Sequence, residues 1–281
     1  MRIAMTVALP QEYGPFLKCC GPWRRLSTRP FKQYLHAACD REILLVETGM
    51  GQKPVQAALD TVVREFAPDL LISFGFAGSL HESLEVGTLC LVEAFFHLDA
   101  ASPPGLGEPP LHAAASAAPG DFSVTRLVHK AAILTVASPK PKASLVKLCR
   151  DIPSLLDMES YHVARFAMEA KLPFLCLRSV SDGSRHEIDF DLEAITDGSG
   201  RVRMMRVLAA VVRHPQWIRS FLQSWKRSRT AGKTLADGLC SLLTLPPEEL
   251  RRMGATVVPG FVCNEARRLF GKSVWERQGA S

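Results

Sequence analysis

Residues 172–185 read LPFLCLRSVSDGSR, an apolar run of strand length that stops on an aspartate and a glycine. The apolar part is typical of a strand buried on both faces, and Ser181-Asp182-Gly183 is typical of a turn. Runs of the same character recur along the first two hundred residues, at 2–9, 42–47, 69–74, 87–92 and 131–136. We therefore expect a sheet of largely buried strands, of which 173–181 is one.

Segments of helical period lie between some of these runs. Apolar residues spaced three or four positions apart form one stripe at 55–66 and another at 163–170. Buried strands separated by amphipathic helices predict a largely parallel or mixed sheet that is covered on both faces. The expected fold class is α/β, a three-layer αβα sandwich with a central mixed sheet.

Two parts of the chain break this alternation. Residues 100–121 are rich in Pro, Gly, Ala and Ser, and we assign them no secondary structure. After about residue 200 we expect no further strands, only helices interrupted at His214-Pro215 and again near 230–232. The expected organisation is an α/β domain over 1–200 and a basic helical region over 201–281 that packs on it.

The composition of the 281 residues, with 47% hydrophobic and 22% charged, allows a sizeable core and excludes a disordered chain. No stretch reaches the roughly 18 apolar residues of a membrane-spanning helix, and residues 1–14 lack the features of a signal peptide. A cytoplasmic protein is expected. The eight cysteines show no C-x-x-C pair or zinc-like histidine spacing, so we expect reduced thiols and no metal.

The net charge of +6 is concentrated toward the carboxyl-terminal side. Residues 1–200 hold 19 Lys and Arg against 23 Asp and Glu, whereas residues 201–281 hold 15 against 5. Such a region is a solvated packing face, a nucleic-acid surface, or an attachment to an anionic membrane leaflet. Nucleic acid is least favoured, because no recognised reading module is present. Peripheral contact with the inner membrane face would use a stripe formed by Trp217, Ile218, Phe221, Leu222 and Trp225.

Small and acidic residues follow several of the expected strands. The run 42–47 leads into Thr48-Gly49-Met50-Gly51, and the run 69–74 leads into residues 75–79, GFAGS. Ligands of open α/β sheets bind beyond the carboxyl ends of the strands, where glycine lets the backbone approach closely. Asp182 stands at this edge, and we expect Glu12 and Glu159 to share one cleft with it.

The same residues resemble a known family. ETGMG (47–51), LLISFGFAGSL (70–80), LLDMESYHVARFA (155–167) and LPFLCLRSVSD (172–182) occur in the order and approximate spacing of the nucleoside phosphorylase and nucleosidase superfamily. The resemblance covers about residues 1–195 and is closest to the methylthioadenosine/S-adenosylhomocysteine nucleosidase branch. Residues 197–239 are similar to the hopanoid-associated phosphorylases, which implies removal of adenine from adenosylhopane in hopanoid biosynthesis.

The resemblance implies a role for each strand-end residue. Cleaving a ribosyl C–N bond needs an acid for the departing purine and an anchor for the sugar. Asp182 would donate a proton to purine N7, oriented by Ser181, and Glu12 would activate water. Glu159 would hold the ribose hydroxyls, with Met158 against the sugar face. The remaining implied residues are Phe76, Ala77 and Gly78 for substrate binding, and Thr48, Gly49, Gly51, Ser73 and Gly75 for a phosphate or water site.

Each assignment has a simpler alternative. Asp182 suits a turn, Glu159 a helix cap and Glu12 a first helical turn. Arg178, inside the last strand, is either an anion contact or one half of a buried ion pair.

The reaction also has alternatives. Glu12, together with the absence of arginine from VALPQEY (7–13), favours water over inorganic phosphate as co-substrate, and no other cofactor is implied. The alternative substrates are methylthioadenosine, S-adenosylhomocysteine and futalosine. A further alternative is a non-catalytic nucleoside-binding or scaffolding module. We expect a homodimer.

Overall fold

The structure is a computed structural model that describes residues 1–98, 108–114, 128–138, 141–146, 149, 152–184 and 217–260. The domain boundary expected near residue 200 and the helix break expected at His214-Pro215 lie outside these residues. So does most of the segment 100–121.

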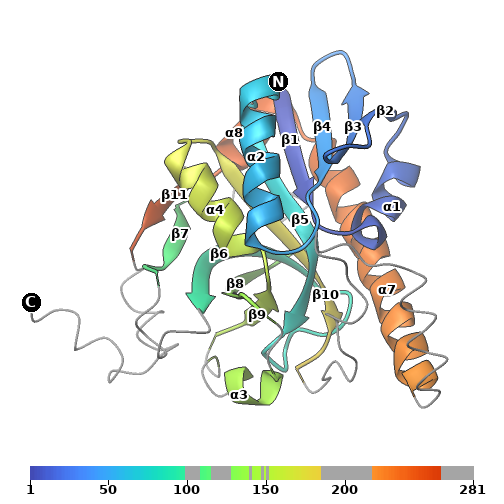
Figure 1. The fold of residues 1–281 in the computed structure, drawn as a ribbon, viewed down its shortest axis with the longest axis vertical. Helices are drawn as coiled ribbons and strands as arrows, with labels where there is room; N and C mark the ends of the chain where they lie inside the picture. The colour runs from blue at the N-terminus through green and yellow to red at the C-terminus, as the bar shows by residue number, and fades with distance from the viewer. Residues whose placement is uncertain are drawn as a thin grey trace, which may run out of the picture.

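The strands of the described residues form one mixed sheet of eleven strands (Figure 1). Its parallel centre contains β4 (Glu42–Glu47), β1 (Arg2–Val7), β5 (Leu70–Ser79) and β10 (Phe174–Asp182), in that spatial order. The other strands are β2 (Arg24–Ser27), β3 (Lys32–Ala37), β6 (Leu89–Leu98), β7 (Leu111–Ala114), β8 (Val128–Val136), β9 (Ser154–Asp157) and β11 (Thr256–Pro259). Because the four central strands run parallel, their carboxyl ends meet at one edge of the sheet.

Five strands close part of the sheet on itself. β10 pairs with β5 on one side and with β6 on the other. β6 continues to β8 and β9, and β9 returns to β5 at Gly78 and Ser79. The ten-residue β5 therefore belongs both to the open sheet and to this ring. The expected αβα sandwich with a central mixed sheet is confirmed, and the ring is added to it.

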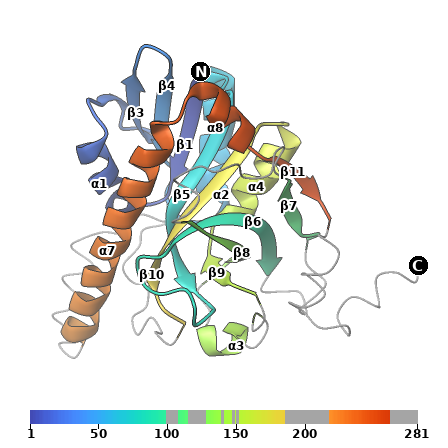
Figure 2. The same cartoon turned by 180° about the vertical axis from the view of Figure 1, so that it is seen from behind.

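Alternate residues of the central strands face two opposite helical layers. On β1, Ile3 and Met5 face one layer and Ala4 faces the other, and none of the three is exposed. The first layer contains α1 (Pro10–Cys19) and α7 (Trp217–Leu243), and the second contains α2 (Gln52–Phe66) and α4 (Ser160–Glu169). Figure 1 shows α2 and α4 in front of the sheet, and Figure 2 shows α7 on the opposite face. Burial on both faces explains why the strands are continuously apolar.

The helix break expected near residues 230–232 is wrong, because α7 is continuous from Trp217 to Leu243. Gly232 instead lies at a close approach between α7 and α1. A Cβ atom built on it would lie 3.3 Å from the backbone oxygen of Gln11 and 3.3 Å from Cγ of Pro15. The small size of glycine therefore permits helix packing here rather than ending the helix.

Two short strands lie where we expected none. β7 falls within the segment 100–121, and β11 follows α7 and the short helix α8 (Pro247–Met253). β7 pairs with β11 and extends the sheet from β6. A four-residue strand of this kind contains too few residues to show a period of its own.

Candidate active site

A cavity opens where β1, β4 and β5 approach their carboxyl ends. Its volume is about 290 Å³ when the solvent-filled mouth is included. Its lining consists of Thr6, Val7, Ala8, Glu12, Thr48, Val55, Ser73, Phe74, Gly75, Phe76, Glu159, Val163 and Arg178. Two glutamates and one arginine therefore line one cavity.

Glu12 lies in the first turn of α1 and ties that helix to β5. Its Oε2 accepts a hydrogen bond from the backbone N–H of Leu9 at 2.7 Å, and its Oε1 accepts one from the N–H of Phe76 at 2.7 Å. Gly75 permits this approach, because a Cβ atom there would lie 2.7 Å from Oε1. Burial raises the pKa of Glu12 to about 7, against the opposing effect of the two hydrogen bonds. Glu12 is therefore a first-turn residue and also a carboxyl group that exchanges its proton near neutral pH.

Glu159 occupies the N-cap position of α4 but makes no side-chain capping hydrogen bond, so the helix-cap alternative is wrong. Its Oε1 instead accepts a hydrogen bond from the backbone N–H of Gly51 at 2.8 Å. Gly51 precedes α2 with a φ of 89°, a conformation that favours glycine. Burial raises the pKa of Glu159 to about 8, and the carboxylate of Asp157 adds to the increase.

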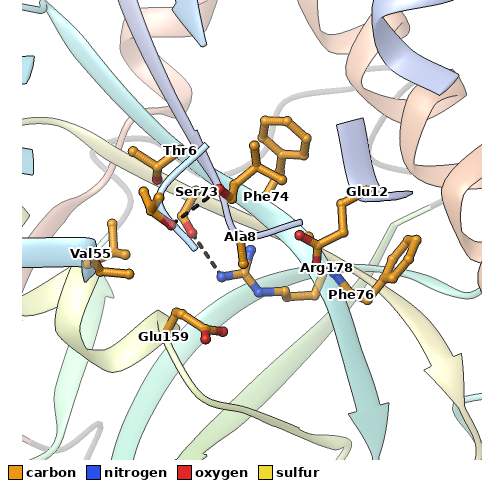
Figure 3. Close-up of a pocket in the computed structure, with 13 residues that line it drawn as sticks. Thr6, Ala8, Glu12, Val55, Ser73, Phe74, Phe76, Glu159 and Arg178 are labelled. Atoms are coloured by element: carbon orange, nitrogen blue, oxygen red, sulfur yellow. Dashed lines mark hydrogen bonds between the residues drawn. The ribbon is translucent and has the colours of Figure 1, made fainter. Parts of the chain in front are cut away.

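Arg178 places a positive charge between these two glutamates. Its side chain is 4% exposed, and its Nε lies 3.4 Å from Oδ2 of Asp157. Its Nη2 donates a hydrogen bond to Oγ of Ser73 at 2.8 Å. Figure 3 shows the carboxyl groups of Glu12 and Glu159 on either side of the guanidinium group. The buried ion pair expected as one alternative is confirmed, and the same side chain also lines the cavity.

The sequence Asp157-Met158-Glu159-Ser160 supports the site in several ways. Oδ2 of Asp157 accepts hydrogen bonds from the N–H of Ser160 at 2.9 Å and from its Oγ at 2.6 Å. Asp157 therefore caps α4 and also holds Arg178, while Glu159 reaches the cavity. Met158 is partly buried and packs in a separate apolar cluster with Leu134.

Asp182 lies farther along the same pair of strands, in register with Gly78 of β5. Its Oδ1 accepts a hydrogen bond from Oγ of Ser181 at 2.6 Å, and its Oδ2 forms an ion pair with Nζ of Lys142. Arg178 is in register with Gly75, three residues earlier on β5. The backbones of Arg178 and Asp182 are therefore about 10 Å apart along the strand.

The residues expected at the site thus divide into groups. The cavity lining includes Glu12, Thr48, Ser73, Gly75, Phe76 and Glu159. The second group consists of Ala77, Gly78, Ser181 and Asp182, which are not part of that lining. The cleft expected to be shared by three acidic residues thus has Glu12 and Glu159 in its lining but not Asp182. Gly49 and Gly51 form the turn between β4 and α2. A ligand that reaches both Glu159 and Asp182 must extend along β5.

Lys142 is the residue near Asp182 that the sequence did not indicate. It begins the short helix α3 (Lys142–Val146) and is 3% exposed. Lysine is almost never fully buried without a partner. The polar stretch SPKPKAS (138–144) shows the lysine but gives no sign of its burial, which depends on pairing with a residue 40 positions away.

The family is shown by the match of residues 2–213 to a family described as the phosphorylase superfamily. The matched region covers most of the chain and contains both groups of site residues. The chain belongs to the phosphorylase superfamily. The superfamily expected from the four sequence motifs is thereby confirmed, whereas the resemblance to the hopanoid-associated phosphorylases stays a prediction.

Within this superfamily the chain is similar to nucleosidases. It is 28% identical over 189 residues to the 5′-methylthioadenosine/S-adenosylhomocysteine nucleosidase of Staphylococcus aureus. This alignment covers 61% of this chain and 82% of the relative. The nucleosidase of the same name from Helicobacter pylori has a TM-score of 0.61 at 15% identity, covering 87% of this chain and 98% of that chain. The futalosine hydrolase of H. pylori also has a TM-score of 0.61, at 16% identity, covering 87% and 97%. These solved structures share the fold.

Proposed function

We propose that the protein cleaves the N-glycosidic bond of a 5′-substituted adenosine with water and releases adenine. The observation that carries the proposal is the arrangement of Glu12, Arg178 and Glu159 around one cavity, with Asp182 beyond it on the same strands. Membership of the phosphorylase superfamily and the similarity to nucleosidases support it.

The ribose occupies the cavity in the proposed complex. Breaking a ribosyl C–N bond places positive charge on the sugar and negative charge on the purine. Glu159 accepts hydrogen bonds from the ribose hydroxyl groups in place of the one that it accepts from the N–H of Gly51. A carboxylate in that position also stabilises the cationic sugar of the transition state.

Glu12 is the proposed base for the attacking water. The water oxygen bonds to C1′, its proton passes to the Glu12 carboxylate, and the C1′–N9 bond breaks. Only the ionised carboxylate accepts this proton, and burial raises the pKa of Glu12 to about 7. The rate is therefore expected to increase as the pH rises through about 7 and 8, because burial raises the pKa of Glu159 to about 8 and this group also acts as a carboxylate.

Asp182 is the proposed donor to the departing base. A nucleoside whose ribose contacts Glu159 extends its purine along β5, in the direction of Gly78 and Asp182. Ser181 holds one oxygen of Asp182 through its hydroxyl group and so fixes the orientation of the carboxyl group. A proton delivered to N7 lets the purine leave as a neutral molecule.

The charges around the cavity favour water over inorganic phosphate. The cation in the lining is Arg178, which already contacts Ser73 and Asp157. A phosphate dianion would lie near the carboxyl groups of Glu12 and Glu159 and would be repelled by them once they are ionised. Hydrolysis needs only a neutral water molecule at this position.

Release of free base tests the reaction. Purified protein is incubated with adenosylhopane, methylthioadenosine, S-adenosylhomocysteine and futalosine, each with and without inorganic phosphate, and the free base is measured by chromatography. We expect base release that does not depend on phosphate. A requirement for phosphate would overturn hydrolysis in favour of phosphorolysis.

Asp182→Asn tests the alternative of a non-catalytic binding module. An enzyme should lose base release in this variant while its circular dichroism and nucleoside binding stay close to those of the wild type. Wild-type protein that binds these nucleosides and releases base from none of them would refute the proposed function.

For the 5′ substituent we propose the pentacyclic hopane of adenosylhopane. The resemblance of residues 197–239 to the hopanoid-associated phosphorylases supports it. A lipid-borne substrate lies at a membrane surface, and α7 presents Leu222 and Trp225, each 50% exposed. The guanidinium carbon of Arg229 lies 5.1 Å from the ring centroid of Trp225 and adds a cation beside them. Within the described part of the chain, no helix has the length and apolar character needed to cross a membrane.

Two comparisons test the substituent and the membrane contact. The similarity to the S. aureus nucleosidase makes methylthioadenosine and S-adenosylhomocysteine the second candidate substrates. A higher kcat/KM for methylthioadenosine than for adenosylhopane would favour these soluble nucleosides over adenosylhopane as the substrate. We expect sedimentation with anionic phospholipid vesicles, lost in a Leu222→Glu, Trp225→Glu double variant, and wild-type protein that stays in the supernatant would contradict this contact. The expected homodimer stays a prediction, which sedimentation velocity would test.

A further inference from the structure

Lys142 is a buried lysine for which the reaction described above has no role. Its side chain is 4% exposed, and its ammonium group forms an ion pair with Oδ2 of Asp182. The same group donates hydrogen bonds to the backbone oxygen atoms of Asp182 at 3.2 Å and Gly183 at 3.0 Å. A buried ion pair adds little to stability compared with apolar packing of the same volume. Stability alone therefore does not explain a lysine at this position.

Asp182 accepts hydrogen bonds at both of its carboxylate oxygens. Ser181 donates from its hydroxyl group to Oδ1 at 2.6 Å, and Lys142 donates to Oδ2. An ammonium group can only donate, so its ion pair with Oδ2 is a contact with the ionised carboxylate. In this state Asp182 has no proton to give, whereas the ammonium group in contact with it carries one.

Gly78 makes room for this contact. A Cβ atom built there would lie 2.8 Å from Nζ of Lys142 and 2.8 Å from Oδ2 of Asp182. The ion pair therefore lies directly against β5, the strand that also lines the cavity at Ser73 and Gly75. The side chain of Asp182 is 19% exposed and that of Lys142 is 4% exposed, so the lysine is the deeper of the two.

We propose that Lys142 is a positioning residue for Asp182 and the source of the proton that Asp182 passes to the departing base. The proposal rests on the function proposed above and adds a second member to the acid side of the reaction.

The protons balance over one turnover. The C1′–N9 bond breaks, its electron pair goes to the purine, and N7 takes a proton from Asp182. That proton reaches Oδ2 of Asp182 from Nζ of Lys142 beforehand and then passes on to N7, so the carboxylate is restored and the lysine becomes a neutral amine. Glu12 holds the proton of the attacking water. Lys142 then takes up a proton from solvent and Glu12 gives one up, which restores the starting state.

The chemistry of the two residue types suits this division. An ordinary aspartate, with a pKa of about 3.9, is protonated in roughly one molecule in a thousand at pH 7. An ordinary lysine, with a pKa of about 10.4, is protonated in nearly every molecule at that pH. The negative charge that develops on the purine makes N7 more basic as the bond breaks, so that N7 accepts the proton from the carboxyl group.

The pH dependence of kcat/KM in three variants tests the proposal. Lys142→Met removes the ammonium group, and Lys142→Arg keeps the positive charge but holds its proton throughout this pH range. Lys130→Met is the matched control, because Lys130 forms a surface ion pair with Glu93 at 2.7 Å and is 59% exposed. The substrate is methylthioadenosine, or adenosylhopane if the wild type releases base only from that nucleoside.

Lys142→Met is expected to be slower than the wild type by about 10²- to 10⁴-fold at pH 8. The deficit should be smaller at pH 5 than at pH 8, because solvent supplies protons more readily at low pH. Lys142→Arg should be nearly as slow at pH 8, and Lys130→Met should match the wild type. Glu12 and Glu159 titrate in every variant, so their effects cancel when each variant is divided by the wild type.

Two results would overturn the proposal. One is a Lys142→Met deficit that does not change with pH. The other is a Lys142→Arg variant that is about as active as the wild type at pH 8, because a lysine with a purely structural role needs only its charge. If circular dichroism shows that Lys142→Met does not fold, the activity of Lys142→Arg at pH 8 becomes the test of the proposal. A wild-type protein that releases no base refutes the proposed function itself, and the proton role falls with it.

Discussion

Replacing Glu12 with glutamine should change how the stability of the protein depends on pH. The unfolded chain releases the Glu12 proton near the ordinary pKa of 4.5, whereas burial keeps it on the folded protein up to about 7. The folded state therefore binds more protons than the unfolded state in this window. The contribution of Glu12 to the free energy of unfolding therefore decreases as the pH rises from 4.5 to about 7 and no longer changes above that pH.

The magnitude follows from the difference between 4.5 and about 7. At 1.36 kcal/mol per pH unit, the wild type loses about 3 kcal/mol across the window, and the glutamine variant does not. Glutamine brings a separate cost, because its NH₂ group faces the N–H of Leu9 or Phe76, where Glu12 accepts hydrogen bonds. That cost, about 1–3 kcal/mol, does not depend on pH and so leaves the slope unchanged.

Urea unfolding of both proteins at pH 5, 6, 7 and 8, followed by circular dichroism, measures this difference. The free energy of unfolding of Glu12→Gln minus that of the wild type should increase steadily up to pH 7 and level off by pH 8. Glu42→Gln is the matched control, because Glu42 has a side chain that is 49% exposed, and its difference should stay flat. A flat difference for Glu12→Gln, or one that decreases with pH, would refute the assignment of a buried, readily protonated carboxyl group at this position.

Three further predictions concern packing and the thiols. Gly78→Ala should displace the ends of two flexible side chains, Lys142 and Asp182. We therefore expect base release to fall by at least about tenfold while the melting temperature changes little. Unchanged activity would contradict the close contact. Leu239→Ala should lower the free energy of unfolding by about 2–5 kcal/mol in urea, because Leu239 of α7 has no exposed surface, and a loss well below this range would contradict the packing of α7. Glutathione disulfide should oxidise Cys19 of α1 and Cys240 of α7, whose sulfur atoms lie 2.7 Å apart, to a disulfide. The two thiol protons are lost, and two glutathione molecules are released. Peptide mapping should show this link and none to the exposed Cys39, and a Cys19→Ser variant should abolish it.

The buried parts of the fold were predictable from the sequence because their pattern is local. Strands β1, β4, β5, β6, β8 and β10 each coincide with an expected apolar run, and α2 and α4 coincide with the two helical stripes. The hairpin of β2 and β3 was not expected, because its residues are mostly partly or fully exposed and polar. The closed ring depends on β9, whose four residues pair with β5 and β8 across long separations that no local pattern reports.

The candidate site was predictable only where a motif marks it. Glu12, Glu159 and Asp182 stand beside strand or helix ends and were found for that reason. Their partners are set by tertiary contacts: the N–H of Gly51 reaches Glu159 across 108 positions, and Lys142 reaches Asp182 across 40. The separation of Asp182 from the cavity lining depends on the pairing of β5 with β10, in which Asp182 lies three residues beyond Arg178 along β5.

The position of α7 has a consequence for any attempt to obtain a smaller enzyme. The match to the family model ends at residue 213, yet the face of the sheet that carries Phe74 and Leu177 is covered by Leu235 and Leu239 of the helix that follows. A chain cut where the resemblance stops would leave this apolar face open to water and prone to self-association. The packing of α7, rather than the end of the family match, therefore governs where this chain can be shortened.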